Sequence, residues 1–194
     1  RLMAKVASPC VPGLYRPCCS QISSQPLWAS AASSVIATAQ VAPSAAEMQA
    51  YRGLHAAAQR GDVAEIRRLA VDPSVLNARD ARGRAPLHVA TFARQPRAVR
   101  ALLHAGADPA ALDHDRYDAV TIAAVADDEV ALRALLEEGA SASLVTSRHD
   151  GTALIAAAHL GHDGVVRQLI AAGAPRDHIN NLHWTALIEA IVLG

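Results

Sequence analysis

The chain has 194 residues, with 18 basic and 18 acidic side chains and a calculated isoelectric point near 7.3. Because the basic residues are scattered rather than gathered in one stripe, this balance argues against a nucleic-acid-binding protein. Aromatic residues make up only 3% of the chain, which argues against a large aromatic-lined ligand pocket, so we expect no cofactor.

Residues 1–45 show no sustained helical or strand period. They are rich in Ser, Ala and Pro and hold the three cysteines, Cys10, Cys18 and Cys19. We predict a poorly ordered leader outside the folded domain. The cysteines lack the spacing of a zinc site, and the apolar run within residues 26–42 is shorter than the roughly 20 residues that span a bilayer. We therefore expect no membrane span.

The leader does not decide the cellular compartment of the protein. Ala37-Thr38-Ala39 resembles a signal-peptidase site and follows a weak apolar stretch with basic residues upstream, as in an export signal before about residue 40. Serines interrupt that stretch, which argues against export. Both a cytoplasmic and an exported protein stay open, because the cysteine-free remainder of the chain fits either redox state.

From residue 46 onward an apolar position recurs at a nearly constant interval. The period is about 33 residues, although the second step, from Leu87 to Ile122, is longer and the third is slightly shorter. The recurring residues are Leu54, Leu87, Ile122, Leu154 and Leu187. A second apolar block follows at one fixed distance, at Leu69, Leu102 and Leu169, but Leu135 lies two positions closer to Ile122 than that distance. The pattern predicts four helix–turn–helix repeats plus a truncated fifth, with two residues missing between the helices of the third.

Each predicted repeat pairs two kinds of helix. Small residues such as His88-Val89-Ala90 suit a first helix that packs closely on both sides. Val99, Leu102 and Leu103 recur at three- and four-residue spacing, which predicts a second helix with one apolar stripe. Gly106, Gly139 and Gly173 follow the second helices, where a left-handed residue ends a helix at least cost.

The segment Ala85-Pro86-Leu87-His88-Val89-Ala90, with Thr152-Ala153-Leu154 and Thr185-Ala186-Leu187 in step, resembles the T-P-L-H-x-A core of the ankyrin repeat. The resemblance covers residues 51–194, and we place the domain at 46–194. It implies an all-α ankyrin-repeat solenoid of stacked helix–turn–helix units with β-hairpin-like fingers. It also implies a protein–protein interaction scaffold without catalysis, which binds its partner through the concave face formed by the fingers and the first helices.

The chain departs from the family pattern at three places. Asp72-Pro73 replaces the glycine of the first repeat, so we expect Tyr51 to Pro73 to form an N-terminal cap. His183 stands where the finger turn usually has Gly, which predicts either a shifted turn or a left-handed residue strained by roughly 1 kcal/mol. The fifth repeat lacks its second helix, so we expect Ile188 and Ile191 to be partly uncovered and the protein to continue at both ends.

Variable positions on the fingers and at the ends of the first helices supply the candidate contacts. Aromatic and Arg side chains dominate interface hot spots. The candidate partner-binding residues are Arg82, Arg84, Phe92, Tyr117, Arg148, His149, His159 and Trp184. Two alternatives stay open: Phe92 and Trp184 pack between neighbouring repeats as extra core, and the arginines only keep the fingers soluble. Tyr117 is expected in a finger lengthened by about two residues.

The sequence carries no pattern typical of catalysis. His149, His159 and His162 form the strongest cluster of metal-ligand types, but Gly161 interrupts it, and we expect neither a metal site nor an enzyme. The partner is expected to be another protein, and the full-length protein a monomer. One alternative is a docking arm of a larger enzyme or effector whose active domain lies beyond residue 194, and another is self-association through the uncovered last helix.

Overall fold

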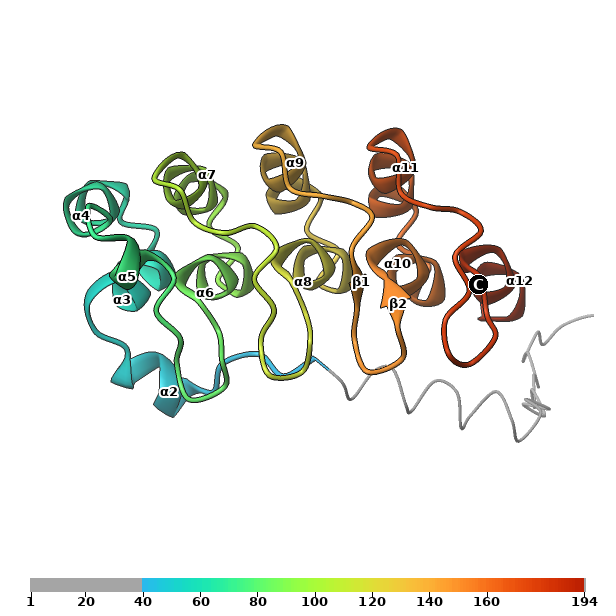
Figure 1. Cartoon of the computed structure of the whole chain (residues 1–194), viewed down its shortest axis with the longest axis horizontal. Helices are drawn as coiled ribbons and strands as arrows, with labels where there is room; N and C mark the ends of the chain where they lie inside the picture. The colour runs from blue at the N-terminus through green and yellow to red at the C-terminus, as the bar shows by residue number, and fades with distance from the viewer. Residues whose placement is uncertain (1–39, 194) are drawn as a thin grey trace, which may run out of the picture.

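The computed structural model describes residues 40–193, in which helices form two parallel rows joined by fingers (Figure 1). The inner row consists of α3 (Gly53–Arg60), α6 (Pro86–Phe92), α8 (Ala119–Val125), α10 (Ala153–Leu160) and α12 (Ala186–Leu193). The outer row consists of α4 (Val63–Leu69), α7 (Pro96–His104), α9 (Glu129–Glu137) and α11 (Asp163–Ala171). Two short helices, α2 (Ala45–Ala50) and α5 (Pro73–Leu76), lie outside these rows. The predicted all-α solenoid of stacked repeats is confirmed.

One continuous core runs between the two rows. Outer helices contribute apolar side chains at helical spacing, such as Val99 and Leu102 of α7, and both are fully buried. Inner helices contribute small residues, such as Ala90, Ala123 and Ala157, which are also fully buried. Because alanine leaves little bulk at these contacts, neighbouring inner helices approach closely, and each repeat covers the core of the next.

The structure corrects the register of the third repeat. Thr121 of α8 occupies the place that His88 has in α6, whereas the predicted register puts Ala123 there. The equivalent core positions are Leu54, Leu87, Val120, Leu154 and Leu187, which are more evenly spaced than a series through Ile122. The prediction of two residues missing between the helices was therefore wrong. Ile122 lies about half a turn beyond Val120 on the same helix, and it matches the recurring apolar position because it is also apolar.

The fingers share one turn motif. Each starts with a side-chain oxygen that accepts hydrogen bonds from the backbone N–H groups two and four residues later, as Asp80 does from Arg82 and Arg84 at 2.8 and 2.9 Å. The fingers span residues 80–84, 113–117, 147–151 and 180–184, and their first residues are Asp80, Asp113, Ser147 and Asn180. The polar residue thus holds the turn without a long strand pair.

The fourth residue of every finger is left-handed. Gly83 has a φ of 74°, and the equivalent residues are Arg116, Asp150 and His183 with φ of 64°, 50° and 64°. The strained geometry expected at His183 is confirmed, and the same geometry at two earlier fingers was missed. One extra residue precedes the finger at 147–151, where β1 (Val145–Thr146) pairs antiparallel with β2 (Gly151–Thr152).

Two histidines attach fingers to the inner helices, and one of them, His88, is fully buried. The Ala85 N–H donates to His88 Nδ1 at 3.0 Å, so Nε2 carries the proton. That N–H reaches the carbonyl oxygens of Ala111 at 2.9 Å and Tyr117 at 3.2 Å. Burial holds the pKa of His88 below its ordinary value, which keeps the ring neutral. His55 makes the equivalent contact with the Arg84 carbonyl oxygen at 3.1 Å, so each of the two histidines joins a finger to an inner helix.

The two ends of the described stack differ. At the first repeat, α5 begins at Pro73 after the N-cap Asp72 and covers the core with the buried Leu76. At the other end α12 has no outer helix beside it in the part of the chain that the structure describes, and Leu187 and Ile191 are 67% and 73% exposed. The uncovered apolar face predicted for the fifth repeat is therefore present.

Part of the predicted leader belongs to the described structure. Ser44 and Glu47 form a capping box at α2, so the boundary expected between residues 45 and 46 falls inside a folded element. The three cysteines and the Ala37-Thr38-Ala39 motif lie outside the described residues. No helix in residues 40–193 is both long enough and apolar enough to cross a bilayer.

Candidate protein-binding surface

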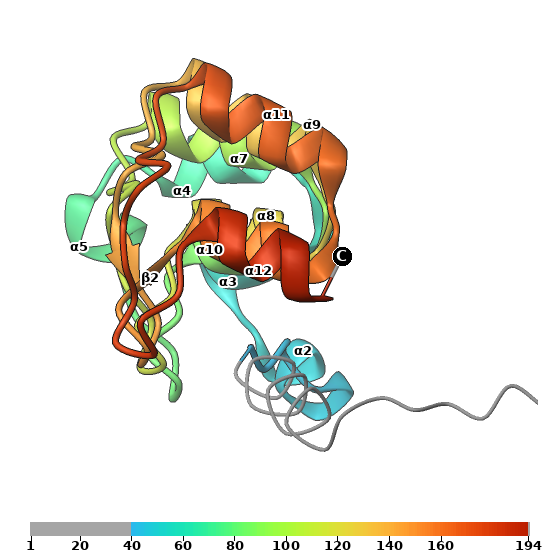
Figure 2. The same ribbon diagram turned by 90° about the vertical axis from the view of Figure 1, so that its right-hand side faces the viewer.

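The fingers and the inner helices meet at an angle, and this angle forms the inner face of the stack. Viewed along the stack, the fingers extend past the inner row on one side (Figure 2). Helix α2 lies within the angle, and residues 40–44 continue from it beneath the fingers (Figure 1). We call residues 40–51 the inner segment. The face that the sequence predicts as a binding surface therefore already carries a piece of this chain.

Arg84 is the centre of an ionic cluster that ties the inner segment to the first finger. Its side chain is only 1% exposed. Nε donates to Asp80 Oδ2 at 2.7 Å, and Nη2 donates to Glu47 Oε1 at 2.6 Å. The Tyr51 hydroxyl donates to the same Asp80 oxygen at 2.8 Å. One guanidinium is thus shared by two carboxylates that lie on elements far apart in the chain.

Glu47 is held in its ionised form. Hydrogen bonds from the backbone and side chain of Ser44, and then the Arg84 guanidinium, lower the pKa of Glu47 to about 2. The Ser44 N–H donates to Glu47 Oε2 at 2.7 Å, which leaves the other oxygen for Arg84. The capping box therefore aims a charged carboxylate at the inner face.

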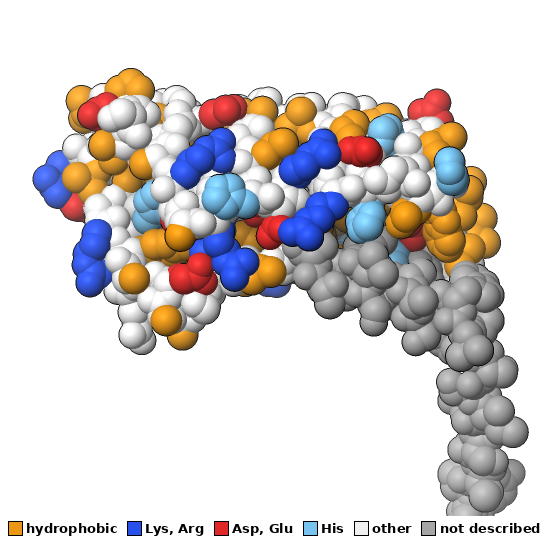
Figure 3. Space-filling view, turned by 60° about the horizontal axis from the view of Figure 1, so that its bottom comes forward, with side chains coloured by type: hydrophobic (Ala, Val, Ile, Leu, Met, Phe, Trp, Pro, Cys, Tyr) orange, Lys and Arg blue, Asp and Glu red, His pale blue; other side chains and the backbone are white. Residues whose placement is uncertain are grey.

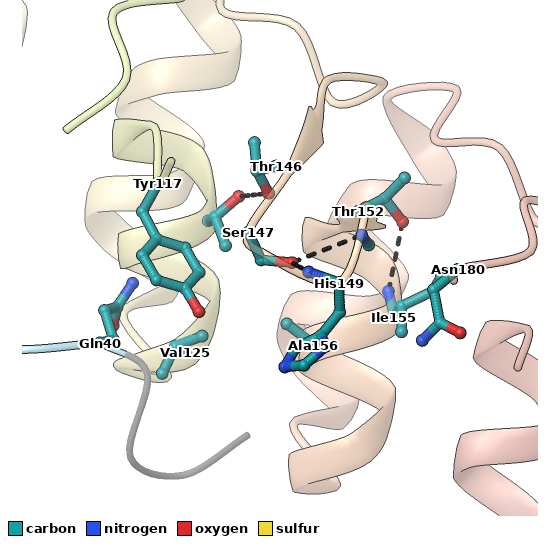
Figure 4. A pocket seen from close by; sticks show the side chains of 12 residues that line it. Gln40, Tyr117, Val125, Thr146, Ser147, His149, Thr152, Ile155, Ala156 and Asn180 are labelled. Atoms are coloured by element: carbon teal, nitrogen blue, oxygen red, sulfur yellow. Dashed lines mark hydrogen bonds between the residues drawn. The ribbon is translucent and has the colours of Figure 1, made fainter. Parts of the chain in front are cut away.

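Tyr117 is buried rather than exposed. It is 5% exposed, and burial raises the pKa of its hydroxyl to about 12. Figure 4 shows its ring beside Gln40 of the inner segment, at a small pocket that His149 and Ile155 also line. The expectation of a lengthened finger at this residue was wrong, because the extra residue precedes the next finger instead.

Phe92 lies in a second depression of the inner face. It is half-buried, and it lines this depression with Val89 and with Pro43 and Met48 of the inner segment. The aromatic ring therefore faces a depression that the inner segment also lines. This arrangement was not predicted from the sequence, although the spacing of Ser44 and Glu47 is visible there as a capping box.

Arginine and histidine side chains line the row of fingers (Figure 3). The exposed members are Arg82, His114, Arg116, Arg148 and His183. Arg116 reaches Asp150 at 3.2 Å, and Arg148 pairs with Asp115, so two ion pairs connect the fingers at 113–117 and 147–151. Such exposed pairs contribute little stability, and their guanidinium groups stay accessible from solvent.

The remaining candidates divide between surface and core. Trp184 and His149 are half-buried. His159 is 8% exposed, and its Nδ1 lies 2.9 Å from Glu189 Oε2 of α12. Three of the candidate residues, Arg84, Tyr117 and His159, are therefore buried: the inner segment covers the first, the finger and helix packing covers the second, and α12 covers the third.

A buried carboxylate at the start of α8 provides a stability test. Asp118 caps the helix by accepting from the Thr121 N–H at 2.9 Å, and burial raises the pKa of Asp118. A raised pKa means that ionisation above the unfolded pKa costs stability. At pH 7 we expect Asp118→Asn to keep the cap and leave stability unchanged or up to about 1 kcal/mol higher, whereas Asp118→Ala loses about 1 kcal/mol.

Urea unfolding at pH 7 measures this difference, with Asp62→Asn at the exposed cap of α4 as the control. A clear loss of stability in Asp118→Asn, of the size seen in Asp118→Ala, would show that the negative charge itself is needed.

Comparison with known proteins decides the family. A family model described as ankyrin repeats (3 copies) matches residues 29–113 and again residues 114–194. The chain belongs to the ankyrin-repeat family. Ankyrin repeats are generally protein–protein interaction modules, and the family is typically non-catalytic.

Individual relatives agree with this assignment. YahD of Escherichia coli (strain K12), named as an ankyrin repeat protein, is 33% identical over 139 residues, which cover 71% of this chain and 69% of YahD. Protein PhlB of Serratia liquefaciens is 39% identical over 88 residues, 45% of this chain and 39% of PhlB. The crystal structure of an ankyrin repeat domain from Acinetobacter baumannii AYE aligns with a TM-score of 0.67 and 42% identity, covering 73% of this chain and 71% of that one.

The histidines considered as metal ligands each have a different hydrogen-bond partner. His162 Nδ1 lies 2.9 Å from the Ala124 carbonyl oxygen, and His159 faces Glu189. Among the residues that the structure describes, no three His, Cys, Asp or Glu side chains are grouped so as to hold an ion.

Proposed function

We propose that this ankyrin-repeat protein binds another protein through its inner face and fingertips, without catalysing a reaction. The observation that carries the proposal is the inner segment: Pro43 and Met48 line an apolar depression with Phe92, and Glu47 accepts a hydrogen bond from Arg84. A surface that holds one peptide segment by a charge-assisted hydrogen bond beside an apolar depression has the chemistry to hold another.

The burial pattern sorts the candidate residues into three groups. Arg82, Arg148, His149 and Trp184 are accessible or half-buried on the fingers, and these are the proposed direct contacts. Phe92, Arg84 and Tyr117 lie beneath the inner segment or at its edge, so they form the floor of the site. His159 supports α12 and is assigned to the scaffold.

A pull-down from host extract tests the proposal. We expect the parent chain to retain a partner and the triple variant Arg82→Ala, Arg148→Ala, Trp184→Ala to lose at least about tenfold in affinity, because Arg and Trp anchors carry much of the energy of an interface. The variant keeps the buried core, since none of the three side chains is buried.

The matched control is Arg97→Ala, Arg133→Ala, Ile170→Ala, which removes two exposed arginines and one exposed apolar side chain from the outer helices. Circular dichroism verifies that both triple variants are folded. Equal retention of the partner by parent and fingertip variant would contradict the proposal. The alternative of a docking arm within a larger enzyme or effector stays a prediction, which the coding sequence beyond residue 194 tests.

A further inference from the structure

We propose that the inner face is a binding site for a short acidic helical peptide, and that the inner segment, residues 40–51, is its resident occupant. A protein partner at this site must then displace the segment, and it carries similar chemistry: a carboxylate in the first turn of a helix and an apolar stretch before it. This inference rests on the proposed function, because it assigns the chemistry of the same surface.

The ionic contact defines one half of the site. Arg84 donates to Glu47 at 2.6 Å and to the Val41 carbonyl oxygen at 3.5 Å, so it binds both a side chain and the backbone of the segment. Arg82 adds a second guanidinium, with Nε 3.4 Å from the same Glu47 oxygen. Two arginines converging on one carboxylate are a recognition arrangement for an acidic group.

An apolar depression defines the other half. Ala42, Pro43 and Met48 line it from the inner segment, and Val89 and Phe92 line it from α6. Further along, Gln40 reaches the pocket beside Tyr117. Figure 1 shows the extended part of the segment running below α6 and α8, past the fingers. The surface therefore accepts an extended stretch followed by one helical turn, which is the form of a linear peptide motif.

The segment is docked on the stack rather than built into its core. No residue of α2 is buried, whereas every other helix from α3 to α11 buries at least one. The connection to α3 passes through Gly53, which has a φ of 55°. A Cβ added at Gly53 would have no atom within 4 Å. A permissive glycine in open space allows the segment to swing away without disturbing α3.

The full-length chain with Glu47→Lys tests the inference. Charge reversal places a third cation beside Arg82 and Arg84, which should release the segment. A synthetic peptide of residues 40–51 with the native Glu47, carrying a fluorophore, is then titrated against the parent and the variant by anisotropy. We expect at least about tenfold tighter binding to the variant, because the tethered segment competes at an effective concentration near millimolar in the parent.

Two controls isolate the site. Glu65→Lys in the chain reverses a glutamate in the first turn of α4, which also pairs with an arginine but lies on the outer row. It should bind the peptide as weakly as the parent. A peptide with Glu47→Gln should bind the Glu47→Lys chain at least about tenfold more weakly than the native peptide, since it lacks the carboxylate.

Hydrogen–deuterium exchange of the same chains separates the outcomes. Protection of residues 44–51 in the parent and its loss in Glu47→Lys support the inference. Full exchange of these residues in the parent, or a released segment with no gain in peptide binding, overturns it. A partner from the pull-down that binds parent and Glu47→Lys with equal affinity also overturns it, while the proposed function stands. Peptide binding without any fingertip-dependent partner supports the occupancy and contradicts the function.

Discussion

Replacing Arg84 with alanine will lower the free energy of unfolding by about 3 kcal/mol. Arg84 is 1% exposed and neutralises Asp80 and Glu47, whose side chains are 11% and 31% exposed. Removing the guanidinium leaves Asp80 without its ion-pair partner, leaves Glu47 with only the partly exposed Arg82, and opens the space beneath the inner segment. Because repeats unfold with their neighbours, the first two repeats should lose most of this stability.

Urea unfolding of the full chain measures the loss, and hydrogen–deuterium exchange of residues 40–51 reports the release of the inner segment. Arg82→Ala is the matched control, since Arg82 lies two residues away and is 47% exposed, and its change should stay within about 0.5 kcal/mol. Equal effects of the two substitutions would mean that the Arg84 cluster is no more than a surface ion pair.

His88→Ala will cost about 3 kcal/mol, because the side chain is fully buried and joins one finger to the inner row. The substitution removes the acceptor for the Ala85 N–H and the donor to the Ala111 and Tyr117 carbonyl oxygens. A buried N–H and two carbonyl oxygens then lose a partner, and a cavity adds to the loss.

Thermal and urea unfolding measure this effect, with His104→Ala as the control because the His104 side chain is 68% exposed at the end of α7. Loosening of the finger should also appear as faster amide exchange at residues 111–117. A stability change as small as that of the exposed control would show that water replaces the imidazole at no cost and that His88 does not anchor the finger.

The number, type and order of the repeats follow from local patterns in the chain. Apolar spacing within helices and left-handed glycines such as Gly106 act over a few residues, and they recur in each unit. The error at Ile122 shows the limit of this reasoning. Val120 and Ile122 of α8 are both apolar and buried, so either residue fits the recurring apolar position of the repeat.

The sequence placed the candidate residues on the fingers and inner helices, but it did not show which of their side chains are buried. Arg84, Tyr117 and Trp184 occupy the same place in their respective fingers, yet the first two are buried and the third is half-buried. Their residue types suggested interface anchors. What surrounds each one depends on neighbouring repeats and on the inner segment.

The amino-acid order alone therefore accounts for the ankyrin stack, its uncovered last helix and the variable positions on its fingers. It does so because helix periodicity and turn residues act between near neighbours. The occupied inner face depends on contacts between residues 37 and 43 positions apart, from Arg84 to Glu47 and Val41. No local pattern encodes such pairs, since they arise only when the folded repeats bring the first finger beside the segment that precedes them.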